Sequence, residues 1–331
     1  MKLEVKNSNN KLSPFEDRFP LLFEIVPPAK ENKEKRLQQH IEYLERLFNE
    51  TTVDGINIPE IQEETGKSDK GKRRSEHKER VEPREYVLEL RKHFDTEYMI
   101  NRVVVNHYLN EHEPWFIETH NDYDIHNLIL VGGELPMDKY NTPSVPETTE
   151  YVKSYLNKGK LRATDGTIEP TDFDIGNICI PTRRLEDFDE PDRMIMKMKS
   201  GTDFFTTQIM FESDSVNSLI EDFSHKLAQE KMDPPMIFWT FSPVSSKKDI
   251  DFLRWLGVYI PESTEEKIIN SENPVEQSVE EAVEIWERIK QHNLKLPVPI
   301  PMGIHISVMG PRNLGNGIEI AKRFNEAGVP H

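Results

Sequence analysis

Eight short apolar segments recur along the chain, and stretches with helical apolar spacing separate most of them. Several are continuous runs of Ile, Leu, Val and Phe, as expected for parallel strands buried on both faces. Alternating strands and helices predict a parallel sheet with right-handed crossovers. Eight such units favour a closed (β/α)₈ TIM barrel. The predicted strands span residues 20–26, 54–58, 98–108, 127–131, 176–180, 203–211, 235–241 and 302–309.

The stretches between these segments carry apolar residues on one helical face. In 33–50, for example, these are Leu37, Ile41, Leu44 and Leu47. The predicted helices span residues 33–50, 83–94, 146–158, 190–201, 215–231, 247–257, 279–293 and 316–328.

An open doubly wound sheet is the structural alternative to the barrel. No GxGxxG motif follows any predicted strand, which disfavours a dinucleotide-binding sheet of that kind. We therefore expect residues 1–331 to form one TIM-barrel domain with insertions at 63–80 and 261–277. The cluster of Lys and Arg at 70–74 could meet a phosphate tail or a polyglutamate, but a solvated loop is the simpler interpretation.

Charge and cysteine content exclude several classes of protein. The formal net charge of −17 argues against nucleic acid as the main partner. Cys179 is the only cysteine, so neither a disulfide framework nor a cysteine-based metal site can form. The sequence also has no HExxH or clustered-histidine motif, and we expect no metal. With no apolar signal segment at the N-terminus and no apolar run of membrane-spanning length, a cytoplasmic protein without a membrane partner is expected. The sequence leaves open whether the protein forms a homo-oligomer.

Active sites of TIM barrels lie at the carboxyl ends of the strands. The first predicted strand carries Glu24 between Phe23 and Ile25. If these two neighbours pack outward against helices, alternation directs Glu24 into the barrel. A carboxyl group in such apolar surroundings has a raised pKa and can act as a general acid. The alternative is a structural carboxylate bonded to a neighbouring strand.

Other polar residues near strand ends have equally open roles. Gln208 could bind the edge of a heterocycle through its amide, or be a satisfied side chain of the barrel interior. Gly132 and Gly133 would permit close approach of a ligand, although a tight turn explains them as well. His305 could be catalytic, but a packed core histidine is the simpler interpretation. Asn57 and Ser307 also stand near strand ends.

Several segments resemble the methylenetetrahydrofolate reductase family. FEIVPPAK is similar to the FEFFPPK stretch that opens these enzymes, and MKMKSGTDFFTTQIMFE matches their K-x-x-x-G-A-(D/N)-(x)3-T-Q-(x)2-F segment. PPMIFWTFSPVSSKKDIDFLRWLGVYIPE and PMGIHISVMGPRN resemble the last two strands and the helix between them. These similarities follow the family order from residue 20 to about residue 328.

The resemblance implies a (β/α)₈ barrel that reduces 5,10-methylenetetrahydrofolate to the 5-methyl form with NAD(P)H, usually through bound FAD. Glu24 matches the family's general acid, and Gln208 matches a glutamine that contacts the pterin. Lys197 matches a lysine that binds the FAD phosphates, and Glu134 replaces an aspartate near the flavin and pterin.

Departures from the family pattern lie mostly on the flavin side. Gly132 stands where the family usually has arginine, and the turns after the second and fifth strands differ. Hydride transfer directly from the nicotinamide is therefore an alternative to transfer through FAD. The remaining candidate contacts are Glu60 and Arg183 for the substrate, and Gly132, Gly133, Asn106, Thr182 and Arg184 for the cofactor.

Two other functions stay open. A pterin-dependent methyltransferase would use the same kind of ligand without nicotinamide. A non-catalytic folate-binding subunit would bind such a ligand but would need neither nicotinamide nor a methyl acceptor.

Overall fold

The computed structural model describes residues 18–63, 71–72, 76–133, 141–162, 166–183, 188–310 and 313–327. Eight parallel strands form a closed barrel in sequence order, with β8 paired to β1. The TIM-barrel prediction is confirmed, and the open sheet is excluded. The strands are β1 (Leu21–Glu24), β2 (Gly55–Ile58), β3 (Glu97–Val103), β4 (Asn127–Val131), β5 (Asp174–Cys179), β6 (Phe204–Thr207), β7 (Met236–Phe241) and β8 (Met302–Ser307).

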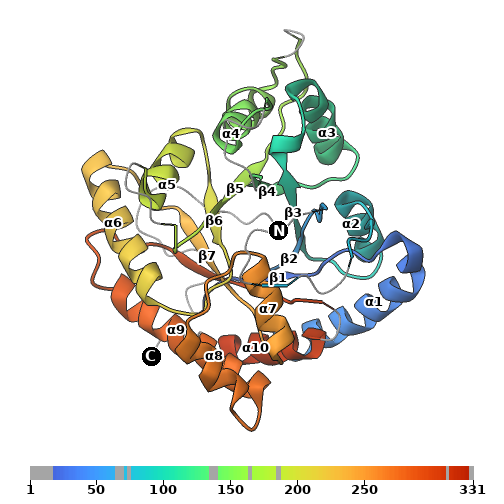
Figure 1. The fold of residues 1–331 in the computed structure, drawn as a ribbon. Helices are drawn as coiled ribbons and strands as arrows, with labels where there is room; N and C mark the ends of the chain where they lie inside the picture. Colours follow the sequence, from blue (N-terminus) through green and yellow to red (C-terminus); the bar gives the residue numbers. More distant parts are fainter. Residues whose placement is uncertain are drawn as a thin grey trace.

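The helices surround the barrel (Figure 1). The helices are α1 (Lys33–Glu50), α2 (Pro83–Arg91), α3 (Leu109–Asn121), α4 (Val145–Ser154), α5 (Glu190–Lys199), α6 (Asp214–Glu230), α7 (Lys247–Trp255), α8 (Glu262–Ile269), α9 (Pro274–Asn293) and α10 (Leu314–Ala327). No helix within the described ranges is long and apolar enough to cross a membrane.

Two predicted strands are too long. The strand predicted at 98–108 ends at Val103, and the chain then turns through a 3₁₀ helix at Val104–Asn106. The strand predicted at 203–211 ends at Thr207, and Phe211 packs beside α7 in a separate apolar cluster. In both segments the apolar run continues because the residues stay buried after the ladder ends, and burial alone does not define backbone conformation.

Two helices were not predicted. The first, α3, contains Pro114, and its hydrophobic face is weak because polar residues and histidines interrupt it. The second, α8, lies inside the predicted insertion at 261–277, and its buried Ile268 packs with Ile250 and Leu253 of α7. The helix predicted at 146–158 is α4 followed by a 3₁₀ turn at Leu156–Lys158.

The barrel interior contains an apolar layer below its carboxyl end. Gly176 and Gly303 leave space for two of its rings: a Cβ at Gly176 would lie 2.3 Å from Phe204, and one at Gly303 would lie 2.5 Å from Phe238. These rings meet edge to face, with centroids 5.9 Å apart. The layer is a floor for any site at the mouth of the barrel. Its buried members are Leu22, Met99, Ile129, Phe204 and Phe238.

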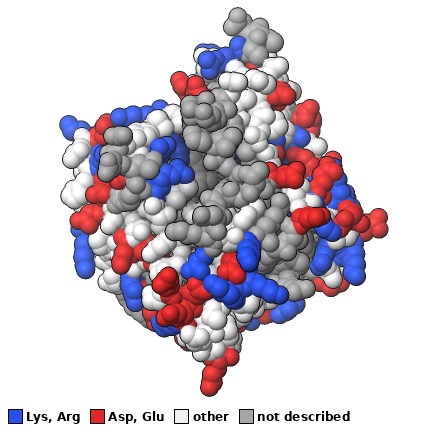
Figure 2. All heavy atoms as spheres, viewed as in Figure 1, with Lys and Arg blue, Asp and Glu red and all other residues white. Residues whose placement is uncertain are grey.

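Acidic and basic side chains are interspersed on the face of the molecule in Figure 2. Some of them are paired across helices, as Lys226 of α6 is with Asp192 of α5 at 2.6 Å. Pairs this exposed contribute little to stability.

Candidate active site

Glu24 is the last residue of β1 and points into the barrel. Its neighbour Phe23 packs outward, with its ring centroid 5.8 Å from that of Tyr43 on α1. Leu22, two residues before Glu24, belongs to the interior apolar floor. Alternation therefore places the Glu24 carboxyl just above this floor, as the sequence predicted.

Side chains from the two neighbouring strands hold the Glu24 carboxyl group. Ser307 of β8 donates its hydroxyl to Oε1 at 2.6 Å, and Asn57 of β2 donates its amide to Oε2 at 3.2 Å. Strand register explains both contacts, because Glu24 pairs with Asn57 on one side and with Ser307 on the other. The side chain keeps 12% of its surface exposed, so the carboxyl is held firmly but stays reachable.

Burial raises the pKa of Glu24, and the hydrogen bonds from Ser307 and Asn57 lower it by less. His305 Nε2 lies 3.9 Å from Oε2, but burial lowers the pKa of His305 to about 4. The imidazole is therefore neutral at pH 7, and this contact is no ion pair that would keep Glu24 ionised. The Thr240 hydroxyl lies 3.2 Å from His305 Nδ1, which agrees with the interpretation of His305 as a packed core histidine.

Two buried amide oxygens on the inward faces of β2 and β3 have no hydrogen-bond partner among the described residues. They are Oδ1 of Asn57 and Oδ1 of Asn101. Asn101 lies on β3 two residues after Met99 of the interior floor, so alternation directs it inward too. Buried acceptors are normally satisfied, and a ligand with N–H donors would satisfy these two. Sequence reasoning missed Asn101 and Thr240, although strand alternation could have indicated both.

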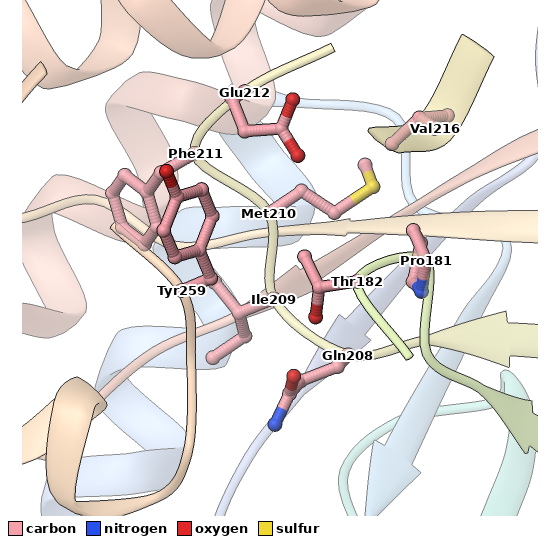
Figure 3. Close-up of a pocket in the computed structure, with 9 residues that line it drawn as sticks. All are labelled: Pro181, Thr182, Gln208, Ile209, Met210, Phe211, Glu212, Val216 and Tyr259. Carbon is pink, nitrogen blue, oxygen red and sulfur yellow. The ribbon is translucent and has the colours of Figure 1, made fainter. Parts of the chain in front are cut away.

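Gln208 directly follows β6 and lines a small depression together with Thr182 (Figure 3). Its backbone N–H continues the ladder by donating to the Cys179 carbonyl at 3.0 Å. Its side-chain amide makes one long hydrogen bond, 3.4 Å, to the Leu256 carbonyl. Gln208 and Glu24 thus lie at the same end of the barrel on different strands, and no described contact joins them. Other residues lining the depression are Met210, Phe211 and Tyr259.

Glu60 is held by β3. Its carboxylate accepts hydrogen bonds from the Arg102 guanidinium at 2.9 Å and from the Val103 amide at 2.7 Å. The same guanidinium lies 4.4 Å from the centroid of the Trp115 ring on α3. Glu60 therefore connects the segment after β2 to the end of β3. Its role in substrate binding stays a prediction.

The basic candidates near β5 also have protein partners. Arg183 lies 3.3 Å from the buried carboxylate of Glu190. Lys197 of α5 donates to the Ile178 carbonyl at 2.6 Å. Burial lowers the pKa of this ammonium group, while the nearby Glu190 raises it by less.

The remaining cofactor candidates are only partly described. Gly132 and Gly133 follow β4, and Asn106 donates its side-chain amide to Gln62. Glu134 and Arg184 lie outside the described residues.

These positions allow a test of whether FAD fits. Its diphosphate needs cations or N–H donors directed at one place, but the Lys197 ammonium is directed at the Ile178 carbonyl. The described candidates do not form a diphosphate site in this arrangement. FAD binding stays a prediction.

Comparison with known proteins supports the fold only. No protein-family model and no curated protein matches the chain. An uncharacterised protein from Clostridium thermocellum that binds two copies of 5-methyl-5,6,7,8-tetrahydrofolic acid has a similar structure. It is 19% identical, with a TM-score of 0.72 over 95% of this chain and 97% of that one. Dihydropteroate synthase from Xanthomonas albilineans, 10% identical over 95% of both chains, reaches a TM-score of 0.45, which is too low to support an argument. The chain thus shares its barrel fold with the Clostridium thermocellum protein.

Proposed function

We propose that this protein binds a tetrahydrofolate-type ligand at the carboxyl end of its barrel and reduces 5,10-methylenetetrahydrofolate to the 5-methyl form with NAD(P)H. The observation that carries the proposal is the Glu24 carboxyl, which is buried, raised in pKa and held by Ser307 and Asn57. The folate bound by the structurally similar Clostridium thermocellum protein supports the ligand class.

The reaction needs an acid that is protonated near neutral pH. In the proposed step, the Glu24 carboxyl donates its proton to N10, one of the two nitrogens that hold the methylene group. The bond between the methylene carbon and N10 then breaks, and the lone pair of N5 forms an iminium ion with that carbon. A hydride from reduced nicotinamide adds to the iminium carbon, which gives the methyl group and NAD(P)⁺. Glu24 regains its proton from solvent through its exposed edge.

The surroundings of Glu24 suit a pterin ring. A tetrahydropterin presents N–H donors along one edge, and the unpaired oxygens of Asn57 and Asn101 are acceptors. These acceptors would orient the ring, and the apolar floor below would exclude water from its lower side. Because His305 is neutral at pH 7, it adds no positive charge that would lower the pKa of Glu24.

The test is an anaerobic assay with methylenetetrahydrofolate and either NADH or NADPH, with and without added FAD. We expect one 5-methyltetrahydrofolate for each nicotinamide oxidised. If the folate binds but no nicotinamide is oxidised in every one of these conditions, the proposed reductase activity is contradicted, and the protein would only bind folate. Methyl transfer to a corrinoid acceptor without nicotinamide would instead indicate a methyltransferase.

Replacing Ser307 with alanine should shift the pH profile. The Ser307 hydrogen bond lowers the pKa of Glu24, so its loss raises that pKa further. Because the reaction needs the protonated acid, kcat/KM falls as pH rises through the Glu24 pKa. The falling limb should therefore move to higher pH in Ser307→Ala.

The matched control for this shift is Ser224→Ala on α6, which removes a buried hydroxyl that donates to the Val298 carbonyl at 2.9 Å, before the amino end of β8. If the falling limb of kcat/KM lies at the same pH in Ser307→Ala and in the wild type, this limb does not report the ionisation of Glu24.

A further inference from the structure

We propose that His120, His126 and Asp172 form a binding site for a divalent transition-metal ion such as Zn²⁺. The three residues come from different segments: the last turn of α3, the residue before β4, and the segment before β5. One ligand atom from each lies within 4.8 Å of the others. The sequence predicted no metal because the third residue is distant along the chain.

The geometry brings both imidazole rings to the same carboxylate oxygen. His120 Nε2 lies 3.1 Å from Asp172 Oδ1, and His126 Nδ1 contacts the same atom. In a tetrahedral zinc site, bonds of about 2.0–2.2 Å place ligand atoms about 3.3–3.6 Å apart. To hold an ion between the three groups, the Asp172 carboxylate, whose side chain is 41% exposed, would move outward, and the two ring nitrogens, now within 4.8 Å of each other, would adopt this spacing.

The second nitrogen of each ring supports this assignment independently. His126 Nε2 lies 2.9 Å from Asp124 Oδ1, and His120 Nδ1 lies 2.8 Å from Asn121 Oδ1. Metal-binding histidines almost always donate their other N–H to such an acceptor, which fixes the tautomer and directs the free lone pair at the metal. With an ion bound, these outer acceptors would hold the tautomers whose lone pairs point at the shared centre.

Two imidazole nitrogens and one carboxylate oxygen suit Zn²⁺ and its neighbours better than Mg²⁺ or Ca²⁺, which prefer oxygen ligands. With three protein ligands, water would complete the tetrahedron. The side chains of His120 and His126 are 19% and 33% exposed, so an ion can enter from solvent.

The location of this site indicates a structural role. His126 directly precedes β4 and Asp172 lies two residues before β5, so the cluster is at the amino end of the strands. Glu24 is at the carboxyl end of β1, which is the opposite end of the barrel. In TIM barrels the amino end contributes stability rather than catalysis. An ion here would join α3 to the starts of two strands, independently of the proposed reductase activity.

The experiment is a Zn²⁺ titration of the full chain against a chromophoric chelator. We expect one tight site in the wild type, with Kd increased more than tenfold in His126→Ala and in Asp172→Asn. His225→Ala is the matched control, because His225 is an exposed histidine on α6, and its affinity should equal that of the wild type.

Asp124→Gly removes the outer acceptor without changing the ligands. Asp124 has φ 51°, a left-handed conformation that glycine adopts readily, so the turn should persist. We expect a 10- to 100-fold weaker Kd, roughly the usual effect of losing such a partner. The Co²⁺-loaded wild type should also show the strong visible bands of a tetrahedral site.

Absence of a tight site in the wild type would overturn the proposal. Equal affinity in wild type, His126→Ala and Asp124→Gly would overturn it as well, because the bound metal would then be an adventitious ion only. Neither result bears on folate binding at the other end of the barrel.

Discussion

Glu24→Gln should lose turnover by about 10²- to 10⁴-fold, the usual contribution of a general acid, while the barrel stays folded. The glutamine amide has nearly the size of the protonated carboxyl and can still accept the hydrogen bond from Ser307. It cannot donate a proton to N10. Steady-state kinetics with methylenetetrahydrofolate should show the loss mainly in kcat, since the pterin would still meet Asn57 and Asn101.

The matched control is Glu319→Gln on α10, an exposed glutamate on a helix that packs against β8. It should keep wild-type turnover. Wild-type kcat in Glu24→Gln, with the same thermal unfolding curve as the control, would remove Glu24 from the chemistry and leave it as a structural carboxylate.

Phe238→Ala should lower the free energy of unfolding by about 3–5 kcal/mol, the range for truncating a buried aromatic ring. The ring lies in the interior floor against Phe204 and fills the space above Gly303. The closed ladder around it prevents collapse onto the cavity, so most of the lost packing is not recovered. Chemical denaturation monitored by circular dichroism measures the change.

Phe238→Leu retains part of the volume and should cost less than Phe238→Ala. Leu294→Ala truncates a side chain that is 73% exposed and should change stability by about 0.5 kcal/mol or less. Equal stability of Phe238→Ala and Leu294→Ala would show that the interior floor is not the packed layer described above.

The barrel and the orientation of Glu24 could be predicted from the sequence because both depend on periodicity. Strand and helix alternate with sufficient regularity to define a parallel sheet, and the period of two along β1 sets which side chain faces inward. The resemblance to a reductase family then suggested the role proposed for Glu24, which alternation alone could not indicate.

The partners of Glu24 could not be predicted as partners. Asn57 and Ser307 lie 33 and 283 residues away along the chain, and only strand register brings them to the two carboxylate oxygens. The sequence likewise gives no sign that Glu60 pairs with Arg102, since such ion pairs depend on side-chain direction after the strands end.

The ends of β3 and β6 show a second limit. Apolar residues follow both strands, but there the backbone leaves the ladder, which periodicity over so few residues cannot detect. Because the apolar face of α3 is weak, the sequence did not predict this helix. The proximity of His120 to His126 and Asp172 could therefore not be predicted either.

The most direct test of the central claim is a crystal structure of this protein with 5-methyltetrahydrofolate. We expect the pterin ring above the interior floor, with its nitrogen edge within hydrogen-bond distance of Asn57 and its C1-bearing side facing the Glu24 carboxyl. A folate bound away from the carboxyl ends of β1, β2 and β8, or no folate at saturating concentration, would contradict the account.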